Sequence, residues 1–182
     1  EAQAMAITKS ILAFESTAAM LPVLVSVAFL PALCEEWLFR GTLQPILVRA
    51  TGNIHVGIWV SAALFSAIHM QFFGFVPRML LGAGFGYLVV YSGSLWPAVV
   101  GHFVNNAGVV VAAGWMGMEW LEEGLEPQPL STWEASDWGY AVIALVALGW
   151  ALRRLTSTGS ATAYLAALSP EATPSAQTPL QS

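Results

Sequence analysis

Long apolar runs separated by short polar breaks dominate the chain. The first run extends from Ile11 to Leu33, and about 20 such residues in a helix cross the ~30 Å hydrocarbon core of a bilayer. Pro22 and Pro31 are expected to bend it, because proline removes a backbone donor and crowds the preceding turn. The later apolar runs are His55 to Met70, Arg78 to Tyr91, Leu95 to Trp115 and Trp138 to Leu152. The pattern predicts an all-α, polytopic transmembrane bundle of about five to six membrane segments.

The breaks between the runs divide the chain further. Trp37 to Ala50 is compatible with helix, and Pro45 is expected to kink or divide it. Thr51-Gly52-Asn53 and Ser92-Gly93-Ser94 are predicted turns. Gly82 and Gly86 form a small-xxx-small pair, which lets a neighbouring helix approach closely.

The C-terminal third has a different composition. Residues 117–137 contain six acids and no basic residue, which predicts a solvated acidic loop. Arg153 and Arg154 follow the last apolar run, and the positive-inside rule then places the C-terminus in the cytoplasm. From residue 156 the chain is rich in Ser, Thr, Ala and Pro. We therefore expect a membrane-embedded domain over 1–155 and a disordered polar tail over 156–182.

Composition agrees with a membrane protein and excludes other classes. Hydrophobic residues make up 57% of the chain and charged residues 9%, against about 25% charge in soluble domains. Six Lys and Arg residues and a net charge of -5 exclude a nucleic-acid-binding face. A single cysteine, Cys34, excludes an internal disulfide.

A few polar residues interrupt the apolar runs, and they carry the candidate chemistry. An ionisable group inside a bilayer costs roughly 3 kcal/mol or more, so such groups are usually paired or functional. The in-span polar residues are Glu35, Glu36, Arg40, His69, His102, Asn105 and Asn106.

Helical spacing sorts these residues into pairs. Glu36 and Arg40 are four apart and are expected to form a supporting ion pair. Glu35 points about a quarter turn away and lacks that partner. His102 and Asn106 are also four apart and share a helix face.

Three segments thus present polar groups to a common interior, and the set is suited to activating water. Glu35 would act as general base and then acid. His69, with Phe65 packed beneath its ring, would hold or deprotonate the water. His102 and Asn106 would donate hydrogen bonds to the oxyanion of a tetrahedral intermediate. Alternatively Glu35, His69 and His102 could bind zinc, and spacing alone does not decide between the two.

The three motifs resemble those of a known family. Glu35-Glu36-x-x-x-Arg40, Phe65-x-x-x-His69 and His102-x-x-x-Asn106 are similar, in order and separation, to the signatures of the CPBP family. This family includes CAAX proteases (type II CAAX prenyl endopeptidases) and bacteriocin-processing enzymes, and is also called Abi. Leu80 to Tyr87 and Ser92 to Ala98 also resemble the family's connecting sequence.

The resemblance implies a multi-pass intramembrane endopeptidase of the cell membrane. It assigns water activation to Glu35, completes the site with His69, His102 and Asn106, and makes Glu36 and Arg40 supporting residues. The implied partners are membrane lipid, a peptide or protein substrate that is lipidated or not, and a membrane protein complex. Since family members often have more spans before the Glu pair, the N-terminus is expected to be incomplete. The rival is a non-catalytic membrane subunit or immunity protein that binds a peptide in the same cavity.

Overall fold

The described part of the chain consists of helices joined by short turns and contains no strand. The computed structural model describes residues 17–70, 72, 74–116, 153 and 160–169. Its elements are α2 (Thr17–Val23), η1 (Leu24–Phe29), α3 (Leu30–Glu36), η2 (Trp37–Leu43), α4 (Gln44–Thr51), α5 (Ile54–Ala67), α6 (Phe75–Ser92), α7 (Trp96–Met116) and α10 (Ser160–Leu168). The predicted all-α class is confirmed.

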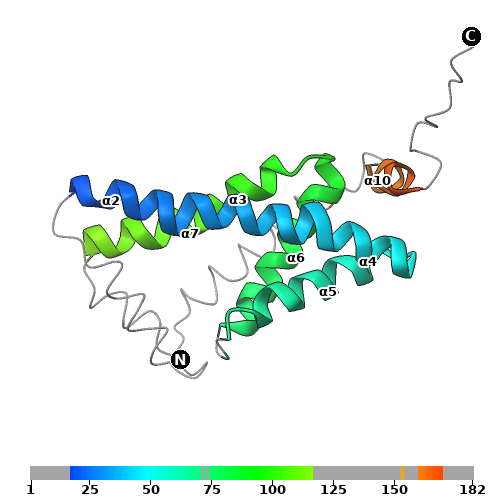
Figure 1. Cartoon of the computed structure of the whole chain (residues 1–182), viewed down its shortest axis with the longest axis horizontal. Helices are drawn as coiled ribbons and strands as arrows, with labels where there is room; N and C mark the ends of the chain where they lie inside the picture. Colours follow the sequence, from blue (N-terminus) through cyan, green and yellow to red (C-terminus); the bar gives the residue numbers. More distant parts are fainter. Residues whose placement is uncertain (1–16, 71, 73, 117–152, 154–159, 170–182) are drawn as a thin grey trace, which may run out of the picture.

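The first five elements form one continuous helix, shown from blue to cyan in Figure 1. Of the two outcomes expected at Pro45, a kink or a division, the division is therefore wrong. Two π-helical segments, η1 and η2, each end two residues before a proline, Pro31 and Pro45 respectively. Their wider turns contain bonds from the Leu30 N–H to the Val25 carbonyl and from the Gln44 N–H to the Phe39 carbonyl. The wider turn accommodates each proline without a break in the helix.

The predicted turns are present, and each has a local cause. Gly52 and Gly93 adopt φ of 65° and 67°, the left-handed conformation that ends α4 and α6. Asn53 then caps α5, because its side-chain oxygen accepts hydrogen bonds from the backbone N–H groups of His55 and Val56.

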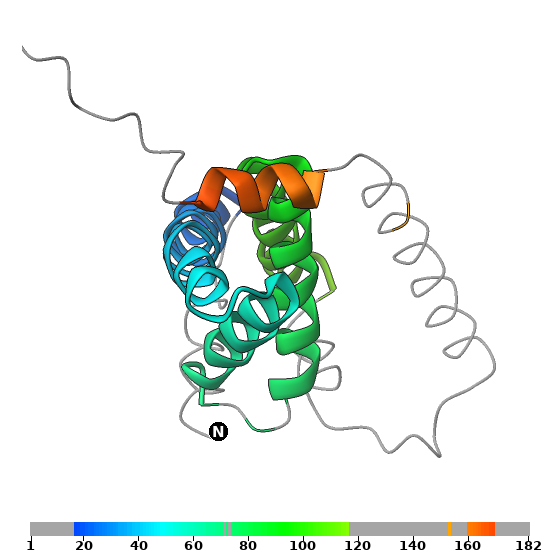
Figure 2. The same ribbon diagram turned by 90° about the vertical axis from the view of Figure 1, so that its right-hand side faces the viewer.

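The helices pack in a simple order. α7 lies along η1 and α3, and α5 packs against both α4 and α6. Figure 1 shows α7 beside the long N-terminal helix, with α5 and α6 below its other half. In Figure 2, α10 crosses one end of the bundle. The long helix, α6 and α7 therefore surround a common interior.

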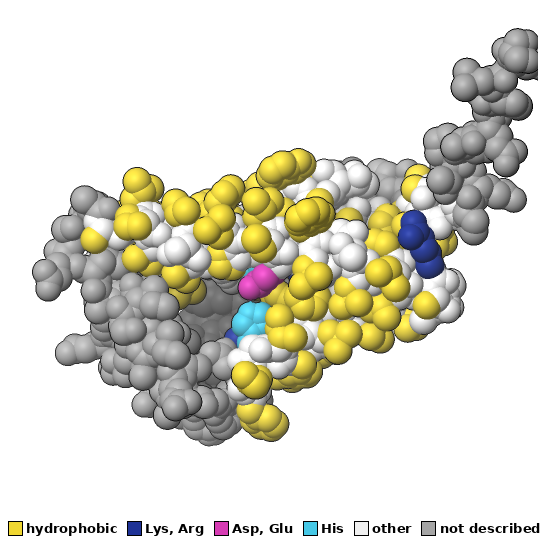
Figure 3. Space-filling model, viewed as in Figure 1, with side chains coloured by type: hydrophobic (Ala, Val, Ile, Leu, Met, Phe, Trp, Pro, Cys, Tyr) yellow, Lys and Arg dark blue, Asp and Glu magenta, His cyan; other side chains and the backbone are white. Residues whose placement is uncertain are grey.

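Within the described residues, three helices are long and apolar enough to cross a membrane: Ala19–Thr51, Phe75–Ser92 and Trp96–Met116. Large apolar side chains such as Trp37 and Trp96 are 69% and 64% exposed, and Figure 3 shows apolar side chains over much of the outer face. Such a surface is suited to lipid.

The expected five to six segments are not confirmed. The runs before and after the Glu pair are one helix, and the apolar helix Ile54–Ala67 has only 14 residues. The predicted segment Trp138–Leu152 and the acidic loop lie outside the described residues.

The expectation of a disordered tail is wrong for residues 160–168. They form α10, which packs on α6. Tyr164 contacts two apolar clusters, one containing Val90 and the other Ala98. The rest of the 156–182 segment, apart from Ser169, lies outside the described residues, as does Arg154.

Candidate active site

The centre of the site is a buried carboxylate that holds two partners. Glu36 is 0% exposed, and its Oε1 accepts a hydrogen bond from Arg40 Nη1 at 2.9 Å. The same oxygen is 2.8 Å from His102 Nδ1 on α7. The predicted Glu36–Arg40 ion pair is therefore present, and Glu36 also links the long helix to α7.

Two hydrogen bonds join the long helix to α6. Arg40 Nη2 donates to the carbonyl of Gly82 at 2.9 Å, and one turn further Gln44 Nε2 donates to the carbonyl of Gly86 at 3.2 Å. A Cβ at Gly82 would lie 2.8 Å from Arg40 Nη2, and one at Gly86 would lie 2.6 Å from Gln44 Oε1. The predicted close approach therefore occurs, and it requires both glycines.

Aromatic rings complete the surroundings of Arg40 and His102. The Arg40 guanidinium lies over the Phe65 ring, 4.6 Å from its centroid. His102 stacks on Phe85 at 5.6 Å and meets the edge of Phe65 at 5.7 Å. These contacts restrict the imidazole to one orientation.

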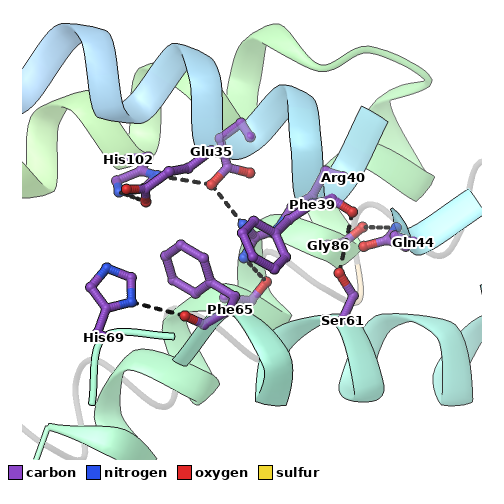
Figure 4. A network of polar contacts seen from close by, with 11 residues as sticks. Glu35, Phe39, Arg40, Gln44, Ser61, Phe65, His69, Gly86 and His102 are labelled. Carbon is purple, nitrogen blue, oxygen red and sulfur yellow. Dashed lines mark hydrogen bonds and ion pairs between the residues drawn. The ribbon is translucent and has the colours of Figure 1, made fainter. Parts of the chain in front are cut away.

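Glu35 lies near the other ring nitrogen of His102, Nε2, while Glu36 holds Nδ1. Glu35 Oε2 is 3.7 Å from His102 Nε2, and the Glu35 side chain keeps 28% of its surface exposed. Figure 4 shows their tips side by side, with His69 across a gap. At this separation one water molecule could contact both atoms.

His69 lies on a turn and not inside a helix. α5 ends at Ala67, and Met70 has φ of 50°, so the chain reverses here. His69 nevertheless packs against Phe65 with ring centroids 5.1 Å apart, and its Nδ1 is 2.8 Å from the Phe65 carbonyl. The predicted Phe65–His69 contact is therefore present. Ser66 secures the turn by donating a hydrogen bond to the Phe75 carbonyl of α6.

The bonds of both imidazoles fix their tautomers. A carbonyl oxygen can only accept, so His69 Nδ1 carries a proton. Glu36 Oε1 already accepts from Arg40, so we assign this oxygen as the acceptor and His102 Nδ1 as the donor of their contact. In the neutral rings, the lone pair is then on Nε2.

The four predicted site residues line one cavity of about 380 Å³. Its walls also include Phe65, Arg78, Asn105 and apolar residues of the long helix, α6 and α7. Asn106 Nδ2 makes a long contact of 3.5 Å to the Val27 carbonyl, and its Oδ1 accepts from Asn105. Figure 3 shows an acidic and a histidine side chain together at the edge of a hollow.

This arrangement does not test the alternative of a zinc site. Within the described ranges, no three His, Cys, Asp or Glu side chains are grouped closely enough to hold a metal ion. Because His102 Nδ1 is held by Glu36, His102 could bind a metal only through Nε2. Zinc binding by Glu35, His69 and His102 therefore stays a prediction.

Sequence reasoning missed Gln44 and the link between Glu36 and His102. Gln44 is 0% exposed, one turn after Arg40 on the same face. A polar residue repeating the i, i+4 spacing was the available signal. The Glu36–His102 contact spans 66 residues, and helical spacing carries no information at that distance.

Comparison with known proteins identifies the family. The model of the family described as Type II CAAX prenyl endopeptidase Rce1-like matches residues 17–108. The chain belongs to the Rce1-like family. The matched region contains all three motifs of this Rce1-like chain, and the family and the apolar helices together indicate a membrane protein.

A curated relative of the Rce1-like chain is the "Uncharacterized protein YpbD" of Bacillus subtilis (strain 168). The two are 26% identical over 91 residues, which are 48% of this chain and 43% of that protein. The chain thus aligns with less than half of its relative's length. No solved structure matches it.

Proposed function

We propose that this Rce1-like chain is an intramembrane endopeptidase that hydrolyses a peptide bond with water activated by Glu35. The observation that carries the proposal is the 3.7 Å approach of Glu35 Oε2 to His102 Nε2 at a cavity also lined by His69 and Asn106. Family membership supports a protease-type membrane function.

The proposed reaction begins with one water molecule between Glu35 and His102. Glu35 accepts a proton from the water, and the water oxygen forms a bond to the carbonyl carbon of the substrate. The carbonyl electron pair moves onto its oxygen. When the tetrahedral intermediate collapses, the C–N bond breaks and Glu35 returns the proton to the amine nitrogen. Water is thereby added across the peptide bond.

The other side chains orient the water molecule and stabilise the oxyanion. His102 Nε2 accepts a hydrogen bond from the water while Glu36 holds the opposite nitrogen. Asn106 supplies a neutral donor for the oxyanion. His102 can join it in that role, as the sequence suggested, only when its ring carries two protons. His69 Nε2 provides a second contact for the water.

The surroundings favour a substrate held at the membrane. The cavity lies between helices whose outer faces are apolar, and Val27, Pro31, Leu81 and Val109 make part of its wall. We therefore propose a peptide or protein substrate presented from the membrane, with lipidated peptides as one candidate class.

The test is cleavage by the full chain in detergent or vesicles, with quenched fluorescent peptides carrying or lacking a lipidated cysteine. Glu35→Gln keeps the shape of the side chain and removes the base, so cleavage should fall at least about a hundredfold. The neighbouring Cys34→Ser is the matched control, because Cys34 is exposed and does not line the cavity.

Unchanged cleavage by Glu35→Gln would reject Glu35 as the base. If the wild type binds the peptides and cleaves none, the rival of a non-catalytic binding or immunity protein is favoured.

Zinc dependence is tested on the same preparation. If zinc takes part, 1,10-phenanthroline should abolish cleavage while its non-chelating 1,7 isomer does not. Elemental analysis of the purified chain should then give about one zinc per molecule. Equal activity with both isomers would contradict the zinc alternative.

A further inference from the structure

His69 differs from the other proposed site residues because it lies outside the helices. The others lie within helices, whereas His69 follows the end of α5 at Ala67. Its imidazole Nδ1 donates to the Phe65 carbonyl at 2.8 Å, the acceptor that the His69 backbone N–H would use if the α-helix continued. The ring is therefore tied to the last turn of α5, and its place in the cavity depends on what holds that turn.

The turn after His69 has a backbone conformation that its own residues do not favour. Met70 adopts φ of 50°, in the left-handed region that methionine rarely enters. Its side chain is 86% exposed, so packing of that side chain does not hold it there. The Met70 N–H donates to the Ala67 carbonyl and the His69 N–H to the Ser66 carbonyl, and both bonds join the turn to α5. An uncommon conformation persists where the surrounding structure compels it, so a contact with a second helix is expected.

Ser66 makes that contact. Its Oγ donates to the carbonyl of Phe75, the first residue of α6, at 2.7 Å. A serine or threonine in a helix commonly donates to the carbonyl four residues earlier, as Ser26 and Thr51 do in this chain. The buried hydroxyl of Ser66 instead bonds outside its own helix and joins the end of α5 to the start of α6. The turn that carries His69 is thereby held at both ends.

We propose that Ser66 is a positioning residue for His69. By joining α5 to α6, it keeps the imidazole across the gap from Glu35 and His102, where Figure 4 shows it. This inference rests on the proposed function, in which the water lies between these side chains. Ser66 does not line the cavity. Its removal should therefore act on cleavage through His69 and not through the substrate.

A double-mutant cycle tests whether Ser66 acts through His69. Peptide cleavage by the full chain in detergent is measured for the wild type, Ser66→Ala, His69→Ala and the double variant. Ser66→Ala should lower kcat at least about fivefold when His69 is present and less than about twofold when it is absent. KM should change little throughout, because neither side chain is assigned to substrate binding.

Ser61→Ala is the matched control. Ser61 is a second buried serine of α5, and its Oγ donates to the Phe39 carbonyl of η2 at 3.2 Å. This substitution removes the same kind of bond between helices and leaves the turn at His69 in place. Thermal unfolding should show similar losses of stability for Ser61→Ala and Ser66→Ala, while only Ser66→Ala lowers kcat. Ser66→Cys, with a weaker donor, should give an intermediate kcat and replaces the alanine variant if that variant does not fold.

A second measurement does not depend on turnover. Hydrogen–deuterium exchange of the His69 and Met70 amides reports how often the turn opens. Exchange should be at least about fivefold faster in Ser66→Ala than in the wild type, and unchanged in Ser61→Ala. A wild type that cleaves no peptide would reject the proposed hydrolysis, and these rates would still decide whether Ser66 holds the turn.

An equal loss of kcat by Ser66→Ala with and without His69 would overturn the inference, because Ser66 would then act by another route. Wild-type exchange rates in Ser66→Ala would also overturn it, as would faster exchange with an unchanged kcat. A loss of kcat in Ser61→Ala as large as in Ser66→Ala would count against it too, since any loosening of α5 would then suffice. None of these results concerns Glu35, so the proposed hydrolysis would stand.

Discussion

At the scale of single residues, one oxygen of Glu36 organises the site. Its Oε1 accepts hydrogen bonds from both Arg40 and His102. Its Oε2 is buried with no hydrogen-bond partner among the described residues. A buried charge whose partner is removed is strongly destabilising. Glu36 therefore both stabilises the bundle and orients His102.

We expect Glu36→Ala to destabilise the protein by about 3–5 kcal/mol, because Arg40 would be left buried without its anion. Thermal unfolding of the detergent-solubilised chain measures this, with Cys34→Ser as control. A melting curve that coincides with the wild type would refute the buried ion pair.

Glu36→Gln keeps an acceptor oxygen for Arg40 Nη1, so it should cost less stability than Glu36→Ala and is better suited to testing the orientation of His102. The amide retains the shape of the side chain but does not carry the charge that fixes the proton on His102 Nδ1. Cleavage should therefore fall at least about tenfold while the protein stays folded, and the pH profile of cleavage should change. Wild-type cleavage with an unaltered pH profile would show that Glu36 does not position His102.

Short-range residue pairs were predictable, and long-range ones were not. The Glu36–Arg40 and Phe65–His69 contacts follow from a spacing of four, because one helical turn or a tight turn after it brings such residues together. The Glu36–His102 contact depends on how α7 packs on α3. No local pattern fixes that packing.

At the scale of helices, α6 carries none of the three motifs and still positions the first of them. The carbonyls of Gly82 and Gly86 accept from Arg40 and Gln44. The sequence identified the two glycines as a packing pair but not as hydrogen-bond acceptors. Every residue has a backbone carbonyl, so residue type does not show which carbonyls accept a bond from a side chain.

Substitution along α6 tests this arrangement against a built-in control. Gly82→Ala and Gly86→Ala should each cost about 1–3 kcal/mol, because the added Cβ meets Arg40 or Gln44 at under 3 Å. Gly84→Ala should be neutral or slightly stabilising, since nothing lies within 4 Å of its Cβ and alanine favours helix. Thermal unfolding of the three variants measures these differences in stability. Equal stability of all three would contradict the close contact between the long helix and α6.

Helix positions were also predicted better than helix geometry. The turns at Gly52 and Gly93 follow from residue type. The π-helical segments before Pro31 and Pro45 do not, because a proline can be accommodated by a kink, a break or a wider turn. The surrounding packing selects among these outcomes.

At the scale of the whole molecule, α10 closes one end of the bundle. Tyr164 packs against α6 and α7 residues, and Arg49 Nε donates to the Leu168 carbonyl at the end of α10. Burial raises the pKa of the Tyr164 phenol, so the docked ring is held in its neutral form. The helix was missed because nine residues are too few to be helical alone, and docking stabilises them.

We expect Tyr164→Ala to lower stability by about 1–2 kcal/mol, less than for a fully buried aromatic residue, because Tyr164 is only half-buried. The neighbouring Leu165, 41% exposed, is the control. Leu165→Ala should change the melting temperature less. The reverse order would show that α10 docks through another face.

The two bonds between the long helix and α6 repeat after one turn, and the two glycines that accept them set the register of the helices. Sliding one helix along the other by about 5.4 Å would bring Arg40 opposite Gly86 and preserve one bond of the two. In that register Gln44 would lie opposite the buried side chain of Val90 and not opposite a glycine, and Glu36 would no longer reach His102. The two glycines therefore act as a ruler for the bundle: their spacing selects the one alignment of the helices in which the polar network closes.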